Sequence, residues 1–345
     1  MPSKIKGRAG CNQATLSTTD LRHQYISGTA AETGKSLAAV QAQTDLRQCF
    51  GSDGVFGFLE AIRLAGLEPP SALEPGRIQR FPGMGKRSGN RAGWCILFED
   101  GQAGCFGDWS SGIEGTWRAD RARPFSPKEQ AAFAKRAREA RRTASQARRT
   151  RQLEAAERAA RIWRSAVPAS ADHSYLLRKK VRPHGARAHG AALCLPVTDF
   201  YGNLHSLQFI SATGRKRLLS GGRKGGCFIP VSKVSSELAR AIICEGWATG
   251  CTLAEDDPNA VVLAAIDAGN LHDVAVAARH RWRSAELVIA GDDDRLTPGN
   301  PGAKKARQAA IAADALLALP QWPDGAPEHL SDFNDLALWL AGGGA

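Results

Sequence analysis

The stretch Ala241-Ile-Ile-Cys-Glu-Gly-Trp-Ala-Thr-Gly250 decides the fold of this chain. Its four apolar residues, 241–244, predict a buried strand, and Glu245 follows directly at the strand's end. Gly246 then opens a turn into a helix that is expected to start near Ala248. A strand followed at once by a helix is typical of α/β proteins with a parallel sheet. The sequence therefore predicts an open α/β sheet with one acid at a strand end.

Two further acidic clusters follow in the same part of the chain. Residues 286–290 predict a second apolar strand that runs into Gly291-Asp292-Asp293-Asp294, and Asp332-Phe-Asn-Asp335 comes later. The carboxyl ends of parallel strands share one crevice, which is where ligands bind in such sheets. Mg²⁺ prefers carboxylate and water oxygens, and substrate phosphates often complete its shell. We therefore expect one Mg²⁺ (or Mn²⁺) site, with the candidate ligands Glu245, Asp292, Asp294, Asp332 and Asp335.

A strand ending in Glu-Gly, followed by a strand ending in Asp-x-Asp, resembles the Toprim pattern of primases, topoisomerases and some nucleases. The stretches Ala265-Ile-Asp-Ala-Gly-Asn-Leu271, Asn300-Pro-Gly302 and Pro196-Val-Thr-Asp-Phe-Tyr-Gly-Asn-Leu-His-Ser-Leu-Gln208 narrow the resemblance to DNA primases encoded by plasmids and phages. Glu-Gly alone is a weak signal, whereas the ordered set of motifs is specific. The resemblance extends, with gaps, from Gly76 to the C-terminus.

The resemblance implies an Mg-dependent nucleotidyltransferase that makes short primers on single-stranded DNA during plasmid or phage replication. In that reaction a 3′ hydroxyl attacks the α-phosphate of an NTP and pyrophosphate leaves. The resemblance implies that Asp292 and Asp294 bind the metal, while Glu245 is either the general base or a further ligand. Asp293 would alternate to the other face of a continuing strand, so it is expected to matter less.

Residues around these strand ends are candidates for binding the nucleotide. A glycine at 246 lets a phosphate approach the backbone, and Thr249 begins a helix whose N-terminus suits a phosphate. Upstream, Arg and Lys stand between glycines at 214–226, which brings positive charge and backbone amides together. A plain basic hairpin is the other interpretation of that segment. The expected nucleotide or phosphate set is Lys216, Arg223, Lys224, Gly246, Thr249, Asp267 and Asn270.

The charge of the 345-residue chain is +12 and is unevenly spread. From Ser236 onward there are 8 Lys and Arg against 16 Asp and Glu, a net charge of −8, so the remainder carries +20. A basic body joined to an acidic module suggests a polyanion held by one part and a metal held by the other. Solubility alone is the alternative, but the size of the split favours nucleic acid.

Two basic segments are candidates for contacting DNA. Residues 127–164 predict a long helix with twelve basic residues and four glutamates, more positive charge than pairing within the helix can absorb. A solvated connecting helix is the alternative to one that contacts backbone phosphates without reading sequence. Trp94, Trp109 and Trp117 are interpreted as core residues rather than base-stacking ones. The expected DNA contacts are Lys86, Arg87, Arg91, Arg141, Arg142, Arg148 and Arg149.

The predicted organisation is a C-terminal Toprim domain, Rossmann-like with a mostly parallel sheet, preceded by α+β primase-type domains and a long basic helix. The expected segments are a polar arm (1–50), a small α+β module (51–122), the linker helix (123–165), the N-terminal part of the primase core (166–235) and the Toprim domain (236–345). Residues 28–36 resemble a Walker A loop, but their glycine spacing is wrong, so no ATPase activity is assigned.

Other features limit the function classes. The eight cysteines stand alone, without a Cys-x-x-Cys pair, so we expect no zinc and a reducing cytoplasm. We expect no membrane span, since no long apolar run is present. A helicase encoded separately is the expected partner. Two alternatives stay open: a Toprim-type nuclease, which normally brings an ATPase, and a non-catalytic module that binds single-stranded DNA and recruits replication proteins.

Overall fold

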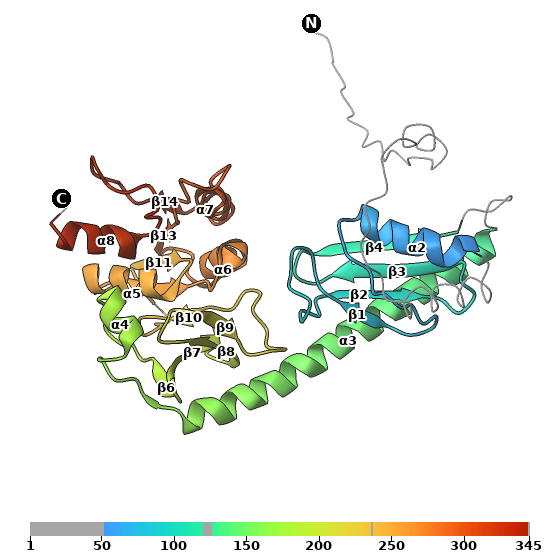
Figure 1. Ribbon diagram of the computed structural model, residues 1–345, viewed down its shortest axis with the longest axis horizontal. Coiled ribbons are helices and arrows are strands. Elements are labelled where there is room, and N and C mark those ends of the chain that lie inside the picture. The colour runs from blue at the N-terminus through green and yellow to red at the C-terminus, as the bar shows by residue number, and fades with distance from the viewer. Residues whose placement is uncertain (1–51, 120–125, 236, 344–345) are drawn as a thin grey trace, which may run out of the picture. The chain divides into compact units, whose positions relative to one another are not determined.

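The structure is a computed structural model that describes residues 52–119, 126–235 and 237–343 (Figure 1). The predicted polar arm and the Walker-like residues 28–36 lie outside the described residues. The chain divides into two compact units, residues 1–140 and 141–345. Each unit is described by itself below. Among the helices of the described ranges, none has the length and apolar character that crossing a bilayer requires.

The first unit contains an antiparallel sheet covered by one helix. The helix is α2 (Ser52–Leu64), and the sheet has the order β1-β2-β3-β4, with strands β1 (Gln79–Phe81), β2 (Gly93–Leu97), β3 (Ala103–Asp108) and β4 (Ile113–Arg118). Phe58 and Ile62 of α2 are buried against the sheet. Trp94 is only 1% exposed and stacks on Trp109, as expected of a core residue. Trp117 packs against Phe58.

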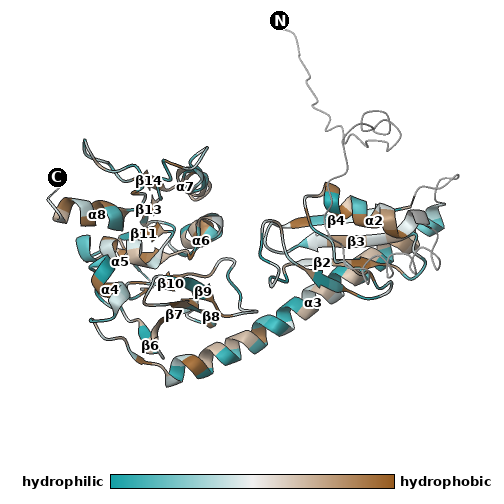
Figure 2. Ribbon diagram, in the orientation of Figure 1, coloured by the Kyte–Doolittle hydropathy of each residue, from teal (hydrophilic) through white to brown (hydrophobic). Residues whose placement is uncertain are grey.

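Helix α3 (Pro127–Ser165) has 39 residues and continues from the first unit into the second. It begins with a capping box, in which the Ser126 backbone N–H donates to Glu129 over 2.8 Å and the Glu129 N–H donates to the Ser126 hydroxyl. Its few apolar residues are scattered among hydrophilic ones, as Figure 2 shows. Ala155 and Ala159 are fully buried in the second unit. The helix predicted over 127–164 is confirmed.

An antiparallel sheet forms the first half of the second unit. Its order is β5-β6-β7-β8-β9, with strands β5 (Val167–Pro168), β6 (Arg187–His189), β7 (Ala192–Thr198), β8 (Leu204–Ile210) and β9 (Lys216–Leu218), and the short helix α4 (Ser174–Lys179) lies between β5 and β6 in sequence. Gly202 turns the chain between β7 and β8 at φ 80°, a conformation that favours glycine. The glycine-rich basic segment, residues 214–226, includes β9 and leads from this sheet to the next one.

The second sheet of this unit is mostly parallel and confirms the predicted fold class. Its order is β10-β12-β11-β13-β14, with strands β10 (Ile229–Pro230), β11 (Arg240–Cys244), β12 (Val261–Ala264), β13 (Glu286–Ala290) and β14 (Leu316–Ala318), and only β10 is antiparallel to its neighbour. Alternation along β11 sends Ala241 and Ile243 to one core and Ile242 and Cys244 to the other. Both faces are therefore covered by helices.

The four helices of this sheet are α5 (Trp247–Asp256), α6 (Ala268–Arg281), α7 (Pro301–Ala312) and α8 (Phe333–Ala341). Helices α6 and α7 cover one face, and α5 and α8 cover the other (Figure 1). Each of α5, α6 and α7 begins shortly after the carboxyl end of a strand. That arrangement brings strand ends and helix N-termini to one edge of the sheet, where ligands bind in folds of this class.

Candidate functional site: an acidic edge of the parallel sheet

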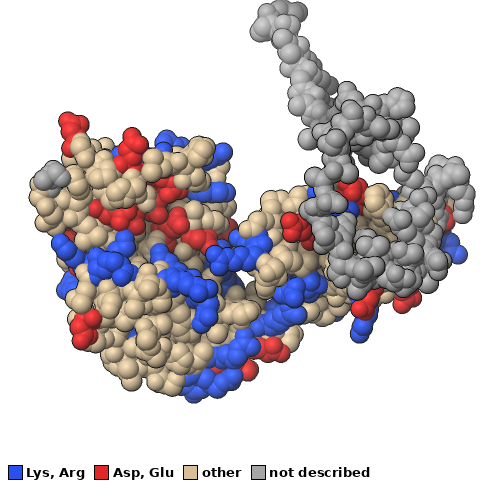
Figure 3. Space-filling view, in the orientation of Figure 1, with Lys and Arg blue, Asp and Glu red and all other residues tan. Residues whose placement is uncertain are grey.

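Three strand ends meet at this edge. In β11, the central strand, Cys244 pairs with Ala264 on one side and with Ala290 on the other. The residues that follow these three therefore emerge together, and they include Glu245 and Asp292. In the second unit, Figure 3 shows acidic side chains gathered near β11, β13 and α6, with basic side chains beside them. The edge thus combines an acidic centre with a basic border.

Asp292 is the most perturbed acid of the edge. Burial, together with the charges of Glu245, Asp332 and Asp294, raises the pKa of Asp292 to about 8, and the charge of Lys216 acts in the opposite direction. Its Oδ1 atom is buried and has no hydrogen-bond partner. A buried carboxylate that faces three other acids is unfavourable unless a proton or a cation compensates it. Asp292 is therefore the residue at which a cation would be stabilised most.

Glu245 lies at the end of the neighbouring strand. Burial raises the pKa of Glu245, and the next cause is the charge of Asp267; the backbone N–H of Ala268 and the ammonium of Lys216 act in the opposite direction. The structure therefore brings Glu245 and Asp292 into one electrostatic cluster, with Lys216 as its nearby cation. A carboxyl group with a raised pKa accepts a proton more readily than an ordinary one.

The last acidic pair has two different roles in the structure. Asp332 caps helix α8 by accepting the N–H of Asp335 over 2.8 Å, and its charge reaches Asp292. Asp335 instead forms an ion pair with Lys179 at 3.1 Å and accepts the N–H of Ser331. Asp332 thus belongs to the acidic cluster, whereas Asp335 is engaged with α4 and with the segment that leads into α8.

The two acids after Asp292 are hydrogen-bonded to the chain that follows them. Asp294 accepts the backbone N–H of Gly302 at 2.9 Å, at the start of α7. Asp293 accepts from Asn300 Nδ2 at 2.6 Å and from Trp322 Nε1 at 2.8 Å. Sequence reasoning ranked Asp293 low and missed Trp322. No local signal marks that tryptophan, because the contact joins positions far apart in the chain.

The predicted cations on the basic border are placed as follows. Lys224 Nζ lies 2.7 and 2.9 Å from the two carboxylate oxygens of Asp267. Lys216 Nζ lies 3.5 Å from the point that a Cβ would occupy on Gly246, so the ammonium is within van der Waals contact of the turn that follows Glu245. Arg223 donates from Nε to the carbonyl of Gly225 at 3.2 Å. Lys216 is therefore the predicted cation nearest to the acidic cluster.

Two predicted nucleotide-binding residues are buried. Asn270 is 1% exposed and donates to the carbonyls of Cys227 at 2.7 Å and Ala265 at 2.9 Å. Its own carbonyl accepts the N–H of Gly226 at 3.0 Å. Thr249, in the first turn of α5, is 2% exposed. In this structure Asn270 fixes the end of the basic loop against β12.

The predicted DNA-contacting residues lie on two surfaces. Lys86, Arg87 and Arg91 are exposed on the loop of the first unit. Asn90 organises that loop, because its side-chain oxygen accepts the N–H groups of Gly83 and Ala92. On helix α3, three of the predicted contacts are exposed and one is half-buried: Arg141, Arg142 and Arg149 are exposed, and Arg148 is half-buried.

The acidic edge fits a hard divalent cation in its donor atoms. Carboxylate oxygens are what Mg²⁺ prefers, and Asp292 Oδ1 is a buried oxygen without a partner. No three His, Cys, Asp or Glu side chains within the described ranges stand in a complete metal-binding arrangement. The fit therefore rests on the chemistry and charge of the donors, with the carboxylates collected at one edge but not converged on one point.

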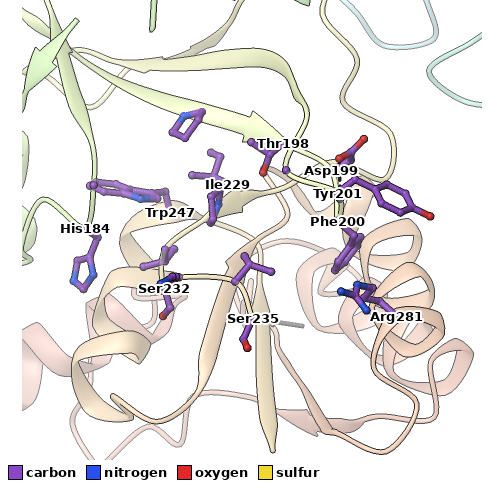
Figure 4. A pocket seen from close by; sticks show the side chains of 17 residues that line it. His184, Thr198, Asp199, Phe200, Tyr201, Ile229, Ser232, Ser235, Trp247 and Arg281 are labelled. Carbon is purple, nitrogen blue, oxygen red and sulfur yellow. Dashed lines mark hydrogen bonds between the residues drawn. The ribbon is translucent and has the colours of Figure 1, made fainter. Parts of the chain in front are cut away.

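A separate pocket lies elsewhere in the second unit. It measures about 730 Å³ and is lined by residues that include His184, Tyr201, Ser232, Trp247 and Arg281 (Figure 4). Ser232 Oγ contacts the carbonyl of Ala260, just before β12 begins, so this part of the pocket is at the opposite end of the strand from the acids. None of the predicted site residues lines it.

Comparisons with known proteins agree with this arrangement. Residues 240–340 match the Toprim domain family. Over 283 residues the chain is 33% identical to a DNA primase TraC of Escherichia coli, covering 78% of this chain and 26% of TraC. A second TraC of Escherichia coli is 32% identical over 281 residues, covering 76% of this chain and 19% of that protein. The chain thus spans about a quarter or less of the length of these relatives.

Among solved structures, the zinc-binding and RNA polymerase domains of the Aquifex aeolicus primase are 12% identical to this chain, with a TM-score of 0.38, covering 87% of this chain and 82% of that one. The primase fragment of the bacteriophage T7 primase-helicase protein gives 12% identity and a TM-score of 0.36, covering 76% of this chain and 95% of that one. Both TM-scores are low, so the similarity of this chain to primases rests on the sequence matches.

Proposed function

Residues 240–340 are a Toprim domain, and from this premise we propose that the chain is a DNA primase of plasmid or phage type. The observation that carries the proposal is the electrostatic coupling of Glu245, Asp292, Asp294 and Asp332 at one sheet edge, with Lys216 as their nearby cation. The similarity to TraC supports the assignment of this edge to primer synthesis. Toprim nucleotidyl transfer requires charge compensation of phosphates, and this edge offers donors suited to Mg²⁺.

The proposed reaction joins two nucleotides on a single-stranded template. The 3′ hydroxyl oxygen forms a bond to the α-phosphorus of an NTP as the bond to the bridging oxygen breaks, and pyrophosphate leaves. We assign the hydroxyl proton to the carboxylate of Glu245, whose raised pKa suits proton acceptance. We assign Lys216 the role of neutralising the triphosphate, which is supported by the effect of its positive charge on Asp292. Asp292, Asp294 and Asp332 would hold magnesium, which would neutralise further charge on the phosphoryl oxygens.

The proposed partners follow from the same reaction. Single-stranded DNA and NTPs are the substrates, with Lys86, Arg87, Arg91 and the exposed arginines of α3 as contacts to template phosphates. We further propose that a separately encoded replicative helicase delivers the template. Action in the reducing cytoplasm is supported by six free cysteines, which are all buried in the described part of the chain.

The test is primer synthesis on mixed-sequence single-stranded DNA with labelled NTPs and Mg²⁺. Wild type is compared with Glu245→Gln and with the Asp292→Asn/Asp294→Asn double variant. Asp256→Asn is the matched control, because Asp256 is an exposed acid of the same unit. We expect short labelled products from wild type and from Asp256→Asn, and at least a 100-fold loss in the other two variants.

Other outcomes would redirect the assignment. Wild-type DNA binding without any product, with or without added replicative helicase, would refute the primase proposal and favour the recruitment module. Cleavage of the DNA under the same conditions would favour a Toprim-type nuclease. Equal synthesis by wild type and by Asp292→Asn/Asp294→Asn would show that another site catalyses the reaction.

A further inference from the structure

Asp293, the middle acid of the triplet, is bonded through both carboxylate oxygens. Asn300 Nδ2 donates to Oδ1 at 2.6 Å, and Trp322 Nε1 donates to Oδ2 at 2.8 Å. Its backbone N–H also donates to the carbonyl of Ser331 at 2.7 Å. The side chain and backbone of one residue therefore join the loop after β13 to two later segments of the chain.

The charge of Asp293 is also compensated, in contrast to that of Asp292. The guanidinium Nε of Arg295 lies 3.9 Å from Asp293 Oδ2, and the Arg295 guanidinium carbon lies 4.5 Å from the centre of the Trp322 ring. Arg295 is itself anchored, because its Nη2 donates to the carbonyl of Pro327 at 2.7 Å. Asp292 has an unpartnered buried oxygen and acids around it. The carboxylate of Asp293 therefore has hydrogen-bond donors and a cation near it, whereas the carboxylate of Asp292 has other acids near it.

The bonds of Asp293 reach both sides of the acidic cluster. Asn300, which holds Oδ1, also accepts the N–H of Asp294 through its side-chain oxygen at 2.9 Å. Ser331, which accepts the Asp293 N–H, directly precedes Asp332. Movement of Asp293 would therefore shift the loop of Asp292 and Asp294 relative to the residue that carries Asp332.

We propose that Asp293 is a positioning residue, not a metal ligand, and that its clamp on Asn300 and Trp322 sets the spacing of Asp292 and Asp294 from Asp332. The proposal rests on the proposed metal-dependent function of the same edge. Residues that orient metal ligands through hydrogen bonds affect metal affinity by about 10- to 100-fold when they are changed. Substitution of Trp322 separates positioning from metal binding, because Trp322 bonds to Asp293 but carries no carboxylate that could bind a metal.

The experiment measures Mn²⁺ binding to the full chain by electron paramagnetic resonance, so it does not depend on primer synthesis. The variants are Asp293→Asn, which keeps the side-chain size but can accept only one of the two donors well, and Trp322→Phe, which removes one donor. Asp324→Asn is the control, since it makes the same charge change on an exposed residue of the segment that contains Trp322. Thermal unfolding in EDTA, followed by circular dichroism, reports whether each variant is folded.

We expect Asp293→Asn and Trp322→Phe each to weaken Mn²⁺ binding about 10-fold or more while remaining folded at the assay temperature, and Asp324→Asn to bind as wild type does. The double variant should lose less than the sum of the two effects, because both changes act on the same hydrogen-bonded group. The Mg²⁺ concentration for half-maximal primer synthesis should rise in parallel.

Three results would overturn the inference. Loss of Mn²⁺ binding in Asp293→Asn with none in Trp322→Phe would make Asp293 a direct ligand. If Asp293→Asn and Trp322→Phe unfold at a lower temperature but bind Mn²⁺ with the affinity of wild type, the clamp stabilises the fold and does not position the metal ligands. Absence of Mn²⁺ binding in wild type would remove the metal centre that the clamp is proposed to serve. If the variants show the expected changes in Mn²⁺ affinity but wild type makes no primers, the proposed function is refuted and the positioning role of Asp293 is retained.

Discussion

Replacement of Asp292 by Asn should make the metal-free protein more stable at alkaline pH and abolish its activity. The pKa of Asp292 rises from the ordinary value of 3.8 to about 8 in the folded protein. The unfolded chain loses this proton near pH 4, whereas the folded chain keeps it until about pH 8. Wild type therefore loses stability as the pH rises through this window, and the neutral amide does not.

The magnitude follows from the pKa difference. A difference of about four pKa units corresponds to roughly 6 kcal/mol at pH values above 8, at about 1.4 kcal/mol per unit. The charge is shared within a cluster of acids, and relaxation with an effective dielectric constant near 20 reduces such penalties. We therefore expect the free energy of unfolding of Asp292→Asn to exceed that of wild type by about 2 kcal/mol or more at pH 8.5. At pH 4 the two proteins should have almost the same free energy of unfolding.

The assay is urea unfolding of both proteins in EDTA at several pH values, analysed for the unit that contains residues 141–345. Asp256→Asn controls for the loss of an exposed negative charge in the same unit. Added Mg²⁺ should stabilise wild type and not Asp292→Asn, since a ligand stabilises only the state that binds it. A stability difference that does not change with pH, or a wild type that is more stable at pH 8.5, would refute the reasoning.

Three further substitutions test other parts of the edge. Lys216→Met should raise the KM for NTP about 10-fold in steady-state primer synthesis, and an unchanged KM would exclude contact with the triphosphate. Gly302→Ala should reduce synthesis at least 100-fold, because its Cβ would lie 2.7 Å from the Asp292 carbonyl oxygen and 2.8 Å from Asp294 Oδ2; retention of full activity would contradict this. Asn270→Ala should cost about 2–4 kcal/mol in urea unfolding, because two buried carbonyls lose their donor, and a smaller loss would mean that water replaces it.

The framework of the acidic edge could be predicted from sequence because its signals are local. Apolar runs mark β11 and β13, and an acid follows each run within two residues, so the parallel sheet brings the acids together. Helix α3 was predictable from its alanine content and from Pro127 in its first turn. Strand β4 was not predicted, since its six residues contain only two large apolar side chains, Ile113 and Trp117, with Gly115 between them.

The partners of individual side chains could not be predicted in the same way. The ion pair between Lys179 and Asp335 joins residues 156 positions apart, and the bond from Trp322 to Asp293 joins residues 29 apart. Neither contact has a periodic or spacing signal in the sequence. Asn270 was expected to face a nucleotide, but its amide is used within the protein. Such roles depend on side-chain direction, which tertiary packing sets.

The ion pair between Lys224 and Asp267 has a consequence for the entry of substrate. Lys224 already donates to both oxygens of a carboxylate, which, like a phosphate group, accepts hydrogen bonds through anionic oxygens. Under the proposed function, a triphosphate that engages Lys224 would compete with Asp267 for the same N–H donors, so nucleotide entry would exchange one anion for another. The displaced carboxylate adds to the repulsion around Glu245, whose pKa Asp267 already raises. Because 34% of the Lys224 side chain and 45% of the Asp267 side chain are exposed, water screens this ion pair and a polyanion would compete with it readily.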